Sequence, residues 1–202
     1  MPLRDGDRIL RSELETFEPA GLLRALAGLE QVLAKPLAMK AMVLNYHLDL
    51  LARMVPDCLL IWLRRDPLFV AASVLQAKRK LYGTIDEWFS FRSDEYEQLI
   101  TRSPYEQVAG QIHYTDAAIA RGLAALPTDR KLVVSYDRFC ENPAAVYEQL
   151  RARYRQRGHE IGPYNGEARF QVSQPDIAPD ERRCIEAALA AFGLVPGPIN
   201  DP

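Results

Sequence analysis

Hydrophobic and polar positions along the chain form blocks that predict strands and helices in alternation. Three short apolar runs are typical of buried parallel strands; they cover 36–42, 58–64 and 131–137. Apolar residues at helical spacing predict helices over 20–34, 45–57, 67–80, 103–125, 142–157 and 179–192, the first of which should dock on a core. The aromatic-rich range 85–100 fits a short helix or a lid-like loop. Strands that alternate with helices predict an α/β fold, with helices on both faces of a parallel sheet.

The turn after the second predicted strand, at Arg65, Asp66 and Pro67, has the features of an anion-binding position. Asp66 is a good N-cap, and Pro67 is a good first residue of the next helix. Arg65 would lie at the carboxyl end of the strand, beside a fresh helix N-terminus. Its guanidinium could there form a bidentate pair with a phosphate. The alternative is that Arg65 and Asp66 form a structural ion pair and helix cap.

Two more polar side chains, Lys40 and Tyr136, fall at or near the ends of the other two predicted strands. Ligands of parallel sheets bind at the carboxyl ends of the strands, so Lys40, Arg65 and Tyr136 should converge there. The ammonium of Lys40 needs an anion, a cavity or water, and a ligand phosphate or sulfonyl oxygen is one such partner. A structural carboxylate is the alternative for Lys40. Tyr136 could stack on a base or be a half-buried core tyrosine.

The composition narrows the class of protein. The chain has 202 residues, of which 48% are hydrophobic and 26% charged, and this balance fits one soluble domain over 1–202, with a tail at 195–202. The formal net charge of −2 does not favour nucleic acid as a partner. The basic run 78–80 lies at a predicted helix C-terminus and is expected to be solvated.

Cysteine spacing and hydropathy narrow the class further. The three cysteines, Cys58, Cys140 and Cys184, have no spacing that suggests a metal site or a disulfide framework. No apolar run approaches the roughly 20 residues that span a bilayer. We therefore expect a cytoplasmic protein with reduced thiols, no metal ion and no membrane span.

The order of these segments resembles the sulfotransferases that use 3′-phosphoadenosine 5′-phosphosulfate, over roughly residues 36–157. Those enzymes have a strand that ends in lysine, a helix, an apolar strand followed by R-D-P, and a serine eight residues past the arginine. Here R-D-P occupies 65–67 and the serine is Ser73. The stretch YDRFCENP, 136–143, resembles the later Y-[ED]-x-[LF]-x-x-[DN]-P pattern of the family.

The resemblance implies a P-loop-NTPase-like parallel sheet flanked by helices, and it implies roles for particular residues. Arg65 and Ser73 match ligands of the nucleotide 3′-phosphate, and Tyr136 matches the tyrosine that approaches the adenine. Lys40 matches the strand lysine near the transferred sulfonate. The implied reaction is in-line transfer of a sulfonate to a hydroxyl or amine of a small-molecule, carbohydrate or lipid acceptor, which leaves adenosine 3′,5′-bisphosphate. A base must remove the acceptor proton, and His47 is the candidate.

The sequence departs from the family pattern at two places. Members begin with a strand and a glycine- or serine-rich loop, such as PRSGTT, that cradles the 5′-phosphosulfate, and nothing before Lys40 matches it. Residues 41–44 are apolar where members often carry histidine or proline. Because the first strand should lie near the middle of the sheet, its absence would expose strand edges and apolar side chains.

These departures leave several hypotheses open. The chain is a sulfotransferase, a truncated or inactive sulfotransferase-like binding module, or a protein completed by a partner chain or a second copy of itself. A nucleotide kinase or NTPase is a weaker alternative, because it would need a glycine-rich phosphate loop and magnesium ligands, and the sequence shows neither.

Overall fold

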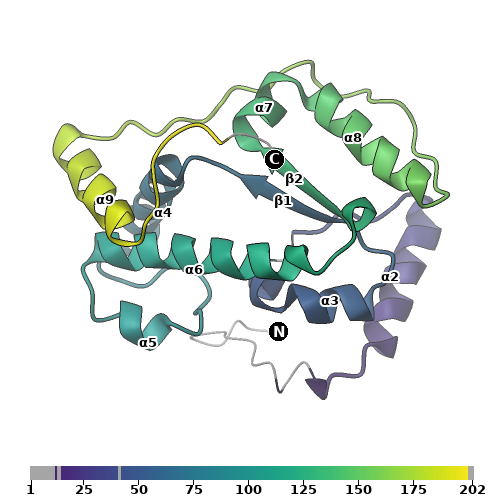
Figure 1. Cartoon of the computed structure of the whole chain (residues 1–202), viewed down its shortest axis with the longest axis horizontal. Coiled ribbons are helices and arrows are strands. Elements are labelled where there is room, and N and C mark those ends of the chain that lie inside the picture. Colours follow the sequence, from purple (N-terminus) through teal and green to yellow (C-terminus); the bar gives the residue numbers. More distant parts are fainter. Residues whose placement is uncertain (1–11, 13–14, 41, 200–202) are drawn as a thin grey trace.

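The computed structural model describes residues 12, 15–40 and 42–199 and shows a mixed α/β protein (Figure 1). Its helices are α2 (Ala20–Leu33), α3 (Leu48–Met54), α4 (Pro67–Tyr82), α5 (Tyr96–Leu99), α6 (Pro104–Ala124), α7 (Tyr136–Glu141), α8 (Pro143–Gln156) and α9 (Pro179–Ala191). Two 3₁₀ helices are η1 (Met42–His47) and η2 (Thr128–Arg130). The strands are β1 (Leu60–Arg64) and β2 (Lys131–Ser135). Each of the six predicted helices has a counterpart, and α5 falls within the ambiguous range 85–100.

The two strands form the predicted parallel sheet, flanked by helices. Leu60 of β1 pairs with Lys131 of β2, and Arg64 pairs with Ser135. The chain between them passes through α4, α5 and α6, and α6 then runs back beneath the sheet to β2 (Figure 1). Both strands therefore point their carboxyl ends toward the turns that begin α4 and α7.

The prediction of a third strand over 36–42 is wrong for the described residues of that range. Residues 36–40 belong to no strand, residue 41 lies outside the described residues, and η1 begins at Met42. A strand needs a ladder of hydrogen bonds, and Pro36 has no N–H to donate. The run is also not buried, because Met39 is 66% exposed and Lys40 is exposed as well. It serves as a linker from α2 to η1.

The main core lies where α4, α6 and α9 pack together, at the end of the molecule away from α2 (Figure 1). Leu75 and Leu189 are fully buried there. Lys78 is only 1% exposed, so the prediction of a solvated end at 78–80 is wrong for this residue, whereas Arg79 and Lys80 are exposed. It follows Leu68, Ala71 and Leu75 at helical spacing, and this places it on the buried face of α4.

A smaller cluster holds one face of β1. Leu60 and Trp62 pack against side chains of α3 and α6, among them Leu48 and Ile119. The opposite face of β1 is open, because Ile61 and Leu63 are 53% and 50% exposed.

Helix α2 forms where it was predicted, but it does not dock on a core. Four of its large apolar side chains are exposed, namely Leu22, Leu29, Val32 and Leu33 at 40%, 50%, 84% and 53%. None of the residues of α2 is buried. Helical spacing determines that a helix has an apolar face, but it does not determine which surface covers that face.

Candidate functional site

The turn between β1 and α4 has the capping geometry that its sequence predicts. Asp66 is the N-cap of α4, and its Oδ1 accepts the N–H of Leu68 at 2.8 Å. The other carboxylate oxygen accepts the N–H of Gly197 at 3.0 Å, so the C-terminal segment is tied to this turn. Among the described residues Asp66 forms no ion pair with Arg65. The cap is therefore present, and the alternative role of Arg65 as an ion-pair partner is not.

Arg65 and Tyr136 meet at the carboxyl ends of the two strands. Because Arg64 and Ser135 are register partners, the residues that follow them lie side by side. The guanidinium carbon of Arg65 is 4.6 Å from the ring centroid of Tyr136 and 5.5 Å from that of Phe69. These distances are typical of cation–π contacts. The structure thus brings together two of the predicted nucleotide ligands.

A third segment, far along the chain, joins this pair. The guanidinium of Arg65 donates a hydrogen bond to the carbonyl oxygen of Ser173. The N–H of Ser173 donates to the Tyr136 hydroxyl at 3.3 Å. Ser173 lies in the irregular stretch between α8 and α9, which has no periodicity and no turn motif that could have indicated its position.

The contacts of Arg65 with Tyr136, Phe69 and Ser173 leave one of its donors, the Nε–H, without an acceptor in the described part of the chain. That atom is buried, and it has no hydrogen-bond partner among the described residues. A buried N–H without an acceptor is costly, so an acceptor at this position would stabilise the site. An anionic oxygen is the best acceptor for a guanidinium, which means that the residues present fit a phosphate group.

The other predicted site residues, Ser73, Lys40 and His47, do not join Arg65 and Tyr136. Ser73 is half-buried on α4, nearly two turns beyond the turn. Lys40 is exposed in the linker before η1, and His47 is buried at the end of η1, which packs on α6. No hydrogen bond, ion pair or ring contact between described residues connects any of the three to Arg65 or Tyr136.

A polar group that the sequence did not single out lies on the α6 side of β1. Burial raises the pKa of the Asp116 carboxyl, although the nearby cationic groups of Arg64 and His113 favour its charged form. Arg64 in turn places its guanidinium carbon 4.8 Å from the Trp62 ring centroid. A carboxyl with a raised pKa close to the carboxyl end of β1 is a feature often found near functional sites.

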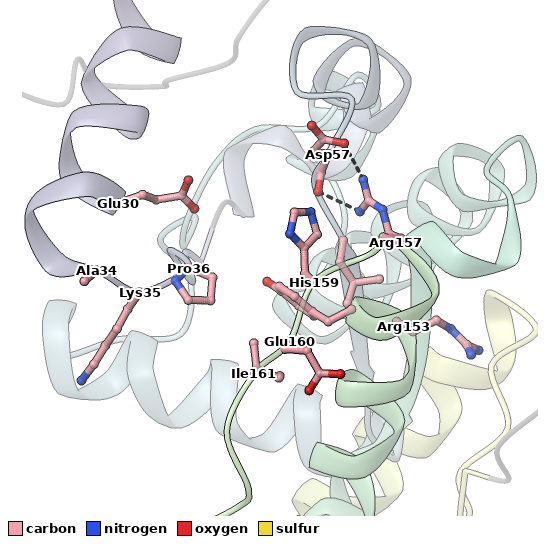
Figure 2. A pocket seen from close by; sticks show the side chains of 12 residues that line it. Glu30, Ala34, Lys35, Pro36, Asp57, Arg153, Arg157, His159, Glu160 and Ile161 are labelled. Carbon is pink, nitrogen blue, oxygen red and sulfur yellow. Dashed lines mark hydrogen bonds and ion pairs between the residues drawn. The ribbon is translucent and has the colours of Figure 1, made fainter.

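A pocket of about 430 Å³ lies at the opposite end of β1 (Figure 2). Its walls come from α2, the linker after it, the loop before β1, and the end of α8 with the following loop; the lining residues are Glu30, Ala34, Lys35, Pro36, Asp57, Leu59, Arg153, Tyr154, Arg157, His159, Glu160 and Ile161. Arg157 is held by Asp57, at 2.8 Å to its carbonyl and 2.9 Å to its carboxylate. Acidic and basic side chains are mixed in this lining, so the pocket favours neither sign of charge in a ligand. The length of β1 separates it from Arg65.

Two common kinds of functional feature are absent from the described part of the chain. Its histidine, cysteine, aspartate and glutamate side chains form no group of three or more that could hold a metal ion. None of its helices combines the length and the apolar character needed to cross a membrane.

Comparison with known families places most of the chain in one of them. The model of the sulfotransferase family matches residues 8–155. That range contains both strands together with Arg65 and Tyr136, whereas Ser173 lies beyond it. Comparisons with curated proteins and with solved structures found no match. The chain belongs to the sulfotransferase family.

Proposed function

We propose that this protein binds 3′-phosphoadenosine 5′-phosphosulfate and transfers its sulfonate group to a hydroxyl or amine of a small-molecule, carbohydrate or lipid acceptor. The observation that carries the proposal is the meeting of Arg65 and Tyr136 at the carboxyl ends of parallel strands, in a chain of the sulfotransferase family. Ligands of parallel sheets bind at this end. The turn also lies at the N-terminus of α4, whose dipole favours an anion.

In the proposed complex, Arg65 would pair with the 3′-phosphate and supply its unpartnered Nε–H as one of the donors. The Tyr136 ring would lie beside the adenine, and Ser73 would add a hydroxyl to the phosphate. When bound, the donor supplies the sulfonate and a phosphate leaving group. The proposed roles of Lys40 and His47 are to hold the sulfonate and to take the proton from the acceptor.

Calorimetric titration with adenosine 3′,5′-bisphosphate tests the nucleotide site. We expect Arg65→Ala to raise Kd about ten- to a hundredfold, because a hydrogen bond to a charged group contributes about 1.5–3 kcal/mol. Arg65→Lys should recover only part of this loss, since lysine keeps the charge but not the planar fork. Arg121→Ala is the matched control, because Arg121 is exposed on α6 and should leave Kd unchanged. Absence of binding at millimolar nucleotide would refute the proposal.

A sulfotransferase-like binding module without catalysis is the second candidate. It is favoured by the position of Lys40, which lies exposed in the linker before η1 instead of at the carboxyl end of a strand beside β1, where it would hold the sulfonate. The two candidates differ in turnover. Incubation of the protein with donor labelled in its sulfonate and with a panel of acceptors should move the label if the first is correct. Label transfer by this chain alone would exclude the second.

A further inference from the structure

Residues 169–175, here called the strap, cross the proposed nucleotide site. The strap contains no helix or strand, and five of its seven residues are exposed. One part is attached to α7, because the N–H of Phe170 donates to the carbonyl of Cys140 at 2.8 Å and its ring stacks on Phe139 at 5.4 Å between centroids. The next attachment is Ser173 itself, at Arg65 and Tyr136.

The peptide groups of Ser173 engage the same two side chains that would bind the nucleotide. The carbonyl of Ser173 accepts a hydrogen bond from Arg65, as a phosphate oxygen would. The N–H of Ser173 donates to the Tyr136 hydroxyl. This carbonyl is a weaker partner than a phosphate, because a neutral acceptor forms a weaker bond to guanidinium than an anionic one does. It also leaves the Nε of Arg65 without an acceptor. The contact is therefore one that a phosphate can displace.

We infer that the strap is a self-inhibitory element, which occupies Arg65 and Tyr136 through the Ser173 peptide until the nucleotide displaces it. This inference rests on the proposed function, because it assigns a regulation to the same site. Displacement exposes little new apolar surface, since the strap is already largely exposed, with Phe170 at 42%. The apparent Kd equals the intrinsic Kd divided by the fraction of molecules with the strap open, so a looser strap gives tighter binding.

The strap can be loosened without changing Arg65, Tyr136 or Ser173. Phe170→Ala removes the stack on Phe139, and circular dichroism would verify that the variant is folded. We expect it to bind adenosine 3′,5′-bisphosphate with a Kd about three- to tenfold lower than that of the wild type, a change that the loss of one weak contact can produce. Gln171→Ala is the matched control, because Gln171 is an exposed strap residue with no hydrogen bond among the described residues. Its Kd should not change.

The outcomes separate the two proposals. If the wild type, Phe170→Ala and Gln171→Ala bind the nucleotide with equal Kd, the strap is not inhibitory. That result would leave the proposed nucleotide site unaffected. Weaker binding by Phe170→Ala also overturns the inhibitory role of the strap, since the strap would then close over the nucleotide instead of competing with it. Absence of binding in all three proteins overturns both proposals.

Hydrogen exchange of the Ser173 amide is an independent test of whether the nucleotide displaces the strap. In the free protein this N–H is bonded to the Tyr136 hydroxyl, so saturating nucleotide should accelerate its exchange. Slower exchange at Ser173 in the presence of nucleotide would contradict displacement.

Discussion

Lys78 shows how a charged residue can be placed on a buried face by helical spacing alone. Its side chain is 1% exposed, and burial lowers its pKa, although the acidic side chains of Asp86 and Glu87 act in the opposite direction. The protein therefore folds against the cost of desolvating this ammonium. Lys78 therefore lies among the apolar residues on the buried face of α4, although its own side chain is charged.

Replacing Lys78 by methionine should stabilise the protein. We expect Lys78→Met to raise the free energy of unfolding at neutral pH by about 1–2 kcal/mol, because methionine fills a similar volume without a charge to desolvate. Thermal unfolding monitored by circular dichroism measures the change. Lys80→Met, two residues further along α4 at an exposed position, is the control and should have little effect.

The wild type and Lys78→Met should also differ in how the free energy of unfolding depends on pH. Because the folded-state pKa of Lys78 lies below 10.5, the unfolded chain binds more protons between these two values. The stability of the wild type therefore gains over that interval as pH rises, and the advantage of Lys78→Met should shrink toward pH 10.5. An advantage that stays constant over the alkaline range would argue against a buried ammonium.

At the scale of single elements, the sequence predicts structure well where the signal is local. Helices α4, α6 and α8 begin with a capping residue followed by proline, and Ser103 forms a full capping box with Glu106. The range 36–42 failed as a strand because strand formation depends on a partner elsewhere in the chain. Helix α2 formed as predicted, but its apolar face remained exposed, because a surface that covers such a face also has to come from elsewhere in the chain.

The candidate site, too, was predictable from the sequence only in part. Arg65 and Tyr136 could be placed together because the carboxyl ends of neighbouring parallel strands always lie close. Lys40 could not, since its expected place depended on a strand that is not present among the described residues. Ser173 carries no local signal at all, because an irregular segment of this length can cross the molecule in many ways.

Two helical glycines offer a matched test of how closely elements pack. A Cβ at Gly110 of α6 would overlap the side chain of Leu99 and meet Phe192 at 3.0 Å, whereas a Cβ at Gly28 of α2 meets nothing within 4 Å. We expect Gly110→Ala to lower the free energy of unfolding by about 1–3 kcal/mol. Gly28→Ala should raise it by about 0.5–1 kcal/mol, the gain from helix propensity alone. Denaturant titration of both variants measures the difference, and equal effects would refute close packing at Gly110.

At the scale of the whole molecule, Arg130 connects segments that are distant in sequence. Its Nη2 donates to the carbonyls of Ala52 and Val55, at 3.0 and 3.1 Å, and so closes the end of α3 just before β1. Arg130→Met should lower the free energy of unfolding by about 2 kcal/mol, because it leaves these carbonyls without their charged donor. Arg182→Met, which breaks an exposed pair with Glu186, should cost less than about 1 kcal/mol. A similar loss in both variants, measured by denaturant titration, would contradict this role of Arg130.

The parallel pairing of β1 with β2 also has a consequence for how the chain folds. Leu60 and Lys131 can meet only after the intervening helices have brought α6 back beneath β1, so the pairing carries a large loop-closure entropy. Contacts of such long sequence separation slow folding. We therefore expect α4 and α6 to associate before the sheet forms. The proposed nucleotide site would then be among the last parts of the protein to assemble, since Arg65 and Tyr136 become neighbours only when the two strands pair.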